Sequence, residues 1–191
     1  MILLLAVVAG LLAGWIRAVV HGRTFGIPSI DRAWLALLAL VPQFALFYLP
    51  GTRDNVPQLW VAAALTSSLV LLLLFVWCNR RYPPFWVMGA GLLMNLAAVA
   101  LNGGLMPISL RTLQRMYPGA PSDVWNVGQR VGSSKNILLP VDETRLEFLA
   151  DRFMLPPWAP NIVAFSLGDV LIAAGVIWFL WRAGGPRTSE V

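Results

Sequence analysis

Long runs of apolar residues alternate with short polar breaks along most of this chain. Five of the runs approach the ~20 residues that a helix needs to cross a bilayer. They predict membrane-spanning helices over residues 2–20, 33–49, 59–78, 85–101 and 162–181. The pattern therefore predicts an all-α membrane protein, a five-transmembrane-helix bundle that forms a single integral membrane domain over residues 1–191.

The first apolar run has to be distinguished from a cleaved signal peptide. It lacks the basic N-terminal region and the small-residue cleavage site that such a signal carries. Instead, Ala6, Gly10 and Gly14 follow one another at four-residue spacing, a pattern that lets membrane helices approach closely. We therefore expect the first run to be retained as a helix.

The long break over residues 102–160 predicts a short helical lid between spans 4 and 5. Ser109 is placed to cap an amphipathic helix along the outer interface, with Leu110, Leu113 and Tyr117 on one face. The polar stretch that follows has many turn residues and no periodicity.

A second short helix is expected in the same break, with Asp142 as its N-cap and an apolar face that reaches Phe153. Pro156 and Pro157 would end it, and Asn161 is placed to cap the last span. The break is too short for a separate catalytic domain.

Composition supports a membrane protein, and charge predicts its orientation. Hydrophobic residues make up 58% of the chain and charged residues only 12%, with a mean hydropathy of +0.72. The net charge of +5 comes from arginines at the ends of apolar runs, which indicates orientation and not nucleic-acid binding. The N-terminus is then outside and the C-terminus cytoplasmic, because these arginines should face the cytoplasm: Arg17, Arg23, Arg32, Arg80, Arg81, Arg182 and Arg187.

Several polar residues interrupt the predicted spans at a similar depth. A helix rises ~1.5 Å per residue, which places these residues on the order of 10–15 Å below the outer surface of the membrane. They are Asp169, Asn95, Gln43, Thr66 and Ser67. Asn102 shares a helix face with Asn95, and Ser166 shares one with Asp169. The set predicts one intramembrane polar cluster around Asp169, whose carboxylate is expensive at membrane depth.

Two interpretations of this cluster remain open. It either joins helices through hydrogen bonds, which suppress wrong packings, or forms a proton- or ligand-binding site that opens outward. No buried Arg or Lys is evident in the sequence as an ion partner for Asp169.

No catalytic set is evident. The string SLGD resembles the GxGD element of intramembrane aspartyl proteases, whose chemistry needs a second carboxylate. Here Ser166 replaces the first glycine, and no other acidic residue is expected at the depth of Asp169. His21 is the single histidine, and Cys78 is the single cysteine, so we expect no metal site, no cofactor and no enzymatic activity.

Three strings, NLAAVALNGGLMPIS, DETRLEFLADRF and FSLGDVLIAAG, resemble a family of small bacterial membrane proteins grouped only as a domain of unknown function. The resemblance spans most of the chain and implies a five-helix protein of the bacterial inner membrane, with no activity carried over. It also suggests that its two sharpest elements work together. These are Asn102, Gly103 and Gly104 with Met106 and Pro107, and Ser166 with Gly168 and Asp169.

For function, the sequence favours a non-enzymatic structural or accessory subunit of a membrane assembly. Its partners would be the lipid bilayer together with other membrane-protein subunits or a second copy of the chain. The alternative is a small transporter, or a ligand- or proton-binding membrane protein, with its site at Asp169 and Asn95.

Overall fold

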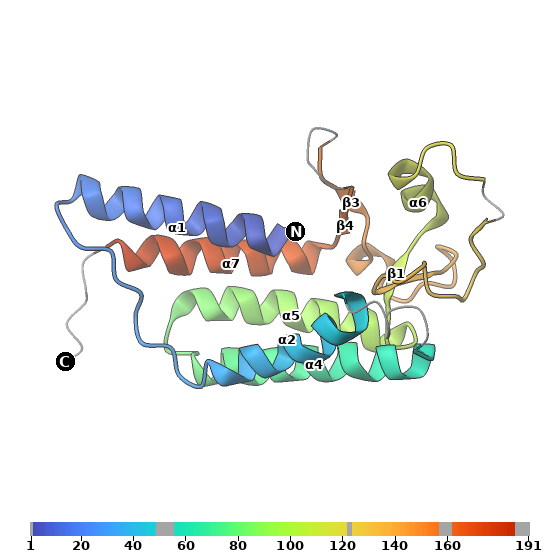
Figure 1. Cartoon of the computed structure of the whole chain (residues 1–191), viewed down its shortest axis with the longest axis horizontal. Coiled ribbons are helices and arrows are strands. Elements are labelled where there is room, and N and C mark those ends of the chain that lie inside the picture. Colours follow the sequence, from blue (N-terminus) through green and yellow to red (C-terminus); the bar gives the residue numbers. More distant parts are fainter. Residues whose placement is uncertain (1, 49–55, 122–123, 157–161, 186–191) are drawn as a thin grey trace.

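The computed structural model describes residues 2–48, 56–121, 124–156 and 162–185, and within these ranges the chain is mostly helical (Figure 1). Helices α1, α4 and α5 are long and apolar enough to cross a membrane, and α2 is a shorter apolar helix. The five long helices are α1 (Ile2–Val20), α2 (Trp34–Tyr48), α4 (Gln58–Cys78), α5 (Pro83–Leu101) and α7 (Leu167–Ala183).

The helices pack in a spatial order that differs from their order along the chain. The most extensive contacts join α1 to α7, α7 to α5, α5 to α4 and α4 to α2, so the first and last helices lie side by side (Figure 1). Gly10 and Gly14 of α1 face α7, where an added Cβ would meet Leu180. The stripe of small residues is thus used within the chain.

The last helix begins later than the apolar pattern predicts. Its first residue is Leu167, because Ala164–Phe165 form strand β4, which pairs antiparallel with β3 (Phe153–Met154). Ser166 then caps the helix. Asn161, the expected cap, lies outside the described residues, as does Leu49 at the expected end of the second span.

We call residues 102–166 the α5–α7 connection. Its described residues form a small folded unit at one end of the helices (Figure 1). Strand β1 (Met106–Ile108) pairs in parallel with β2 (Asn136–Leu138). Helix α6 (Leu110–Met116) forms after Ser109, which accepts a hydrogen bond from the Thr112 backbone N–H. Its Leu113 is buried in the connection's own core with Ile108, Leu138 and Ala164.

The helix expected between Asp142 and Phe153 does not form. That segment contains one turn of 3-10 helix, η2 (Glu147–Leu149), preceded by Leu146 in a left-handed conformation (φ 53). Asp151 instead forms an isolated parallel β-bridge with Ile108, the last residue of β1. Pairing with a distant strand therefore overrides the local helical pattern.

Candidate functional site

The N-terminus of α7 positions Asp169. Ser166 is the N-cap, and its Oγ accepts a hydrogen bond from the Asp169 backbone N–H at 3.1 Å. The Ser166 backbone N–H donates in return to Asp169 Oδ2 at 3.2 Å. This reciprocal capping box satisfies two backbone donors that the first turn of a helix would otherwise leave without partners. Asp169 thus lies in the first turn of α7, not deep inside it.

Helix α5 contributes Asn95 to the same place. Its Nδ2 donates to Asp169 Oδ1 at 2.8 Å, and its Oδ1 accepts from Ser166 Oγ at 2.8 Å. The helices meet closely enough for these bonds because Gly168 and Gly91 face each other. A Cβ added at Gly168 would lie 2.6 Å from the Gly91 carbonyl oxygen and would collide with Asn95 Oδ1.

Lys135, which precedes β2, supplies the cation that the sequence did not reveal. Its Nζ lies 3.7 Å from Asp169 Oδ2 and 3.2 Å from Asp151 Oδ2. The Lys135 side chain is 34% exposed, whereas that of Asp151 is fully buried. We call the group formed by these side chains the junction cluster: Asn95, Lys135, Asn136, Asp151, Ser166 and Asp169.

Asp151 has a side chain that is fully buried in the junction cluster. Its backbone N–H donates to the Pro107 carbonyl at 3.1 Å, and its Oδ2 accepts from Asn136 Nδ2 at 2.8 Å. Its Oδ1 is buried and has no hydrogen-bond partner among the described residues. Asp151 thus contacts Pro107 of the first motif singled out in the sequence, and it shares Lys135 with Asp169 of the second motif.

Burial and charge perturb the two titratable side chains of the α5–α7 connection in this cluster. Burial raises the pKa of the Asp151 carboxyl, although the positive charge of Lys135 opposes this shift. Burial would lower the pKa of Lys135, but its interactions with Asp151 and Asp169 outweigh burial and raise that pKa above its ordinary value. These interactions favour the charged ammonium form of Lys135.

The residues expected to form one polar layer separate into several places. Asn95, Ser166 and Asp169 are joined in the junction cluster. Gln43 donates instead to Ser68, across the contact between α2 and α4, and Ser68 donates to the Ala39 carbonyl. Ser67 is exposed and bonds within its own helix to the Ala64 carbonyl, and Thr66 is half-buried on α4.

Asn102 has a separate role at the end of α5. Its Oδ1 accepts from the Arg145 backbone N–H at 2.9 Å, and its Nδ2 donates to the Arg145 carbonyl at 2.8 Å. Asn79 makes the same paired contact at the end of α4, with the backbone of Asp31 at 2.8 and 2.9 Å. The side-chain amides of Asn102 and Asn79 therefore each hold a connecting segment against the end of a helix.

Sequence reasoning missed Lys135, Asn136, Asp151 and Ser68. Lys135 is the single lysine beside thirteen arginines, which was the one available signal, but no periodicity or spacing connected it with Asp169. The expectations that Asp169 lacks a basic partner and that no other carboxylate shares its level were therefore wrong, because the fold of the α5–α7 connection brings Lys135 and Asp151 to it.

The geometry is that of an ion network. Lys135 lies within 4 Å of both carboxylates, whereas an aspartyl dyad needs its two carboxylates to share a proton directly. Among the described residues, no group of three His, Cys, Asp or Glu side chains is placed to hold a metal ion. A separate apolar pocket of about 510 Å³ lies in the α5–α7 connection, lined by Leu110, Trp125 and Leu138 among others.

Comparison with known proteins gives a family but no chemistry. The chain is 29% identical over 134 residues to an uncharacterized protein of Thermotoga maritima, which covers 70% of this chain and 71% of that protein. No solved structure matches this chain. The family of unknown function DUF5317 matches residues 28–181, a range that contains every member of the junction cluster. The chain therefore belongs to the DUF5317 family.

Proposed function

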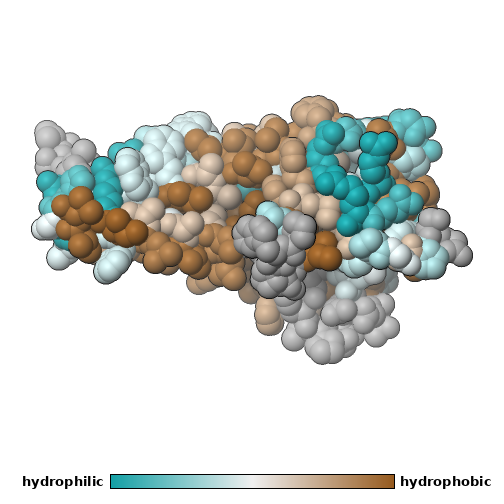
Figure 2. Space-filling model, turned by 90° about the horizontal axis from the view of Figure 1, so that it is seen from above, coloured by the Kyte–Doolittle hydropathy of each residue, from teal (hydrophilic) through white to brown (hydrophobic). Residues whose placement is uncertain are grey.

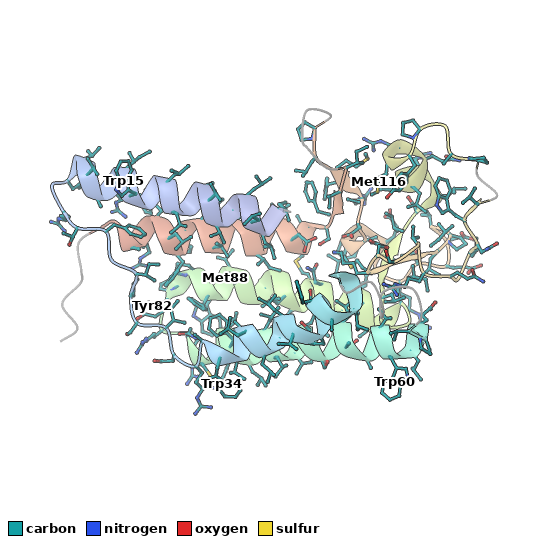
Figure 3. All side chains as sticks on the ribbon, viewed as in Figure 1. Trp15, Trp34, Trp60, Tyr82, Met88 and Met116 are labelled. Atoms are coloured by element: carbon teal, nitrogen blue, oxygen red, sulfur yellow. The ribbon has the colours of Figure 1, made fainter. Side chains whose placement is uncertain are left out.

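We propose that this protein is a five-span protein of the bacterial inner membrane, with α1, α2, α4, α5 and α7 as the spans. Support comes from α1, α4 and α5, which are long and apolar enough to cross a membrane, from the shorter apolar helix α2, and from the molecular surface. Figure 2 shows hydrophobic residues over the middle of the elongated molecule and hydrophilic residues gathered at its two ends. Trp15 and Trp34 lie toward one end and Trp60 toward the other (Figure 3), as expected of an aromatic belt at each interface.

The proposed orientation has the N-terminus outside and the C-terminus in the cytoplasm. Arginines gather at the end opposite the α5–α7 connection, where Arg17 donates to the Trp181 carbonyl and Arg81 donates to the Ser29 carbonyl. Cytoplasmic ends of membrane proteins carry such an excess of basic residues. The α5–α7 connection is then an extracytoplasmic lid.

Its role, we infer, is structural: a non-enzymatic accessory subunit that presents this lid to a membrane assembly. The observation that carries the proposal is the internal pairing of the junction cluster. Asp169 receives hydrogen bonds from Asn95 and Ser166 and lies near Lys135, so its acceptor oxygens are used in joining α5, α7 and the lid. Groups paired in this way stabilise one arrangement of the lid.

Native mass spectrometry of the tagged protein, gently extracted from its host's membranes, tests this role. We expect a stoichiometric protein partner with the wild type. Lys135→Met should weaken the complex because it frees the lid, whereas Arg152→Met is the matched control, since Arg152 forms an exposed ion pair with Glu147 at 3.3 Å. A wild-type monomer without a partner protein would contradict the accessory role.

A second candidate function is a small transporter or a ligand- or proton-binding membrane protein centred on Asp169 and Asn95. The observation that favours it is the buried Oδ1 of Asp151, which has no hydrogen-bond partner among the described residues. Such groups are uncommon in folded proteins and often mark a site with a task. Native mass spectrometry would favour this function over the first if the wild type carries a bound small molecule, seen as a reproducible added mass, and if Asp169→Asn folds but lacks that added mass.

A further inference from the structure

We propose that Asp151 is a proton-binding site. In the folded protein its Oδ1 carries a proton, and the junction cluster holds one ammonium, one carboxylate and one carboxylic acid. The inference bears on the second candidate function and names its ligand as the proton. The accessory role does not depend on it.

Donors and acceptors show that Asp169 is the ionised carboxylate. Its Oδ1 accepts from Asn95 Nδ2 at 2.8 Å, and its Oδ2 accepts from the Ser166 backbone N–H at 3.2 Å. Lys135 Nζ lies 3.7 Å from the same Oδ2. These contacts of the Asp169 carboxylate thus all offer it a hydrogen or a positive charge, and none of them accepts a hydrogen from a carboxylate oxygen. Hydrogen bonds to both oxygens stabilise the charged form.

The two oxygens of Asp151 differ. Its Oδ2 accepts from Asn136 Nδ2 at 2.8 Å and lies 3.2 Å from Lys135 Nζ, so it has the surroundings of a carbonyl oxygen. Its Oδ1 is buried and receives no hydrogen from any described residue. A charged carboxylate oxygen in that position would lose its hydration without compensation. The O–H of a neutral carboxylic acid would also lack a partner among the described residues, but its burial costs far less than the burial of a charge. Oδ1 is therefore the atom that carries the proton.

The balance of charge leads to the same assignment. The charges that act on Asp151 are Lys135, which precedes β2, and Asp169, which lies on α7. Asn95 on α5 and Asn136 on β2 are neutral, and the neighbouring Arg152 and Glu147 pair with each other at the surface. Two carboxylates thus share one ammonium, and protonating one of them leaves the cluster neutral. The raised pKa of the Asp151 carboxyl, caused first by burial, agrees with this.

A bound proton at Asp151 links protonation to the position of the α5–α7 connection. Asp151 belongs to that connection and Asp169 belongs to α7, so opening the contact would expose Asp151 to water and return its ordinary acidity. Closing takes one proton from solvent, and opening releases it. By linkage, whatever opens the contact releases a proton, and high pH favours opening.

Infrared spectroscopy of the full-length protein, with 13C-labelled aspartate and in lipid nanodiscs at neutral pH, tests this assignment. A protonated aspartic carboxyl has a carbonyl band that ionised carboxylates lack. We expect one such band in the wild type, equivalent to one residue, and its loss in Asp151→Asn. A wild type without the band, or a band that persists in Asp151→Asn, would overturn the proposal.

Two further variants keep the test decisive if Asp151→Asn does not fold. In Asp169→Asn, Lys135 has Asp151 as its sole carboxylate partner in the cluster, so Asp151 should ionise and the band should disappear. Asp142→Asn, on an exposed turn of the same connection, should leave the band unchanged. Retention of the full band in Asp169→Asn would show that the charge argument is wrong. None of these results depends on a partner protein, so failure here would be distinguishable from failure of the accessory role.

Discussion

At the scale of single residues, the Ser166 hydroxyl serves two helices. It accepts from the backbone of Asp169 and donates to Asn95, so it both caps α7 and joins α7 to α5. A serine before an acidic residue is a recognisable helix start, and the sequence placed Ser166 and Asp169 on one face. Its apolar pattern nevertheless predicted a helix start near residue 162. Capping chemistry, and not hydropathy, sets where α7 begins.

Replacing Ser166 by Ala should destabilise the protein more than the loss of a simple cap. Loss of an N-cap costs about 1 kcal/mol, and Asn95 Oδ1 would also lose its buried donor, which adds roughly 1–3 kcal/mol. Ser109→Ala is the control, because it removes the cap of α6 and a side-chain hydrogen bond to Thr112 in the same turn, but no hydrogen bond between helices. Reversible unfolding in detergent measures both variants, and equal losses would contradict the double role of Ser166.

The raised pKa of Asp151 predicts how pH acts on this junction. The pKa of the Asp151 carboxyl is 3.8 in the unfolded chain and higher in the folded protein. Its contribution to stability is complete below pH 3.8 and is lost as pH rises through the higher, folded pKa. Lys135, whose pKa is raised above 10.5, loses its contribution only at higher pH still. Hydrogen exchange of residues 134–138 should therefore quicken from acidic to mildly alkaline pH, beyond the intrinsic chemical rate, and Asp151→Asn should remove that excess.

At the scale of elements, close helix contacts depend on glycine. Gly91 and Gly168 let α5 approach α7, and Gly10 and Gly14 let α1 approach the other part of α7. The sequence revealed the second pair through its four-residue spacing. It did not reveal the first pair, because Gly91 and Gly168 are on different helices and their facing positions exist only after packing.

Gly168→Ala should displace α7 from α5 and break the contact between Asn95 and Asp169. The added Cβ would meet Asn95 Oδ1 and the Gly91 carbonyl, and a backbone carbonyl cannot move aside. We expect a loss of at least about 2 kcal/mol, typical of overpacking against a rigid neighbour. Gly89→Ala on α5 is the matched control, since its Cβ would approach a Val76 side-chain carbon at 3.1 Å. Thermal unfolding of both variants measures the difference, and an unchanged Gly168→Ala would contradict this contact.

At the scale of the whole molecule, one ion network joins the α5–α7 connection to the helices. Lys135 and Asp151 come from the connection and Asp169 comes from α7. Asn102 holds the connection at a second point through the Arg145 backbone. Rigid placement of the connection is therefore a property of the whole fold and not of its short strands, since an isolated pair of strands is marginally stable.

Lys135→Met should loosen this attachment. Removing the cation leaves the Asp169 carboxylate without its counterion and Asp151 Oδ2 without its ammonium neighbour. The cost is about 2 kcal/mol, because Lys135 is 34% exposed and solvent screens part of the interaction. Limited proteolysis of the connection should become faster, whereas Arg152→Met should change it little. Equal proteolysis rates for the two variants would show that the junction cluster does not hold the connection.

The single cysteine tests the proposed topology. Cys78 ends α4 at the arginine-rich end, which the proposal places in the cytoplasm. A membrane-impermeant maleimide added to intact cells lacking an outer barrier should leave Cys78 unlabelled. The same reagent should label Asp142→Cys in a Cys78→Ala background, because Asp142 is exposed on the lid. The reverse labelling would invert the orientation.

The sequence by itself determined the approximate positions of the long apolar helices, except the start of α7, since hydrophobic runs and their Pro, Gly and Arg breaks are local properties. It also singled out Asp169, Asn95 and Ser166, because polar residues stand out in apolar runs. Only the tertiary structure decided what surrounds Asp169. Lys135 lies 34 residues before it in the numbering and Asp151 lies 18 before it, and no helical or strand periodicity relates them. Their meeting results from the parallel pairing of β1 with β2 and the bridge at Asp151, contacts whose partners a local pattern does not specify.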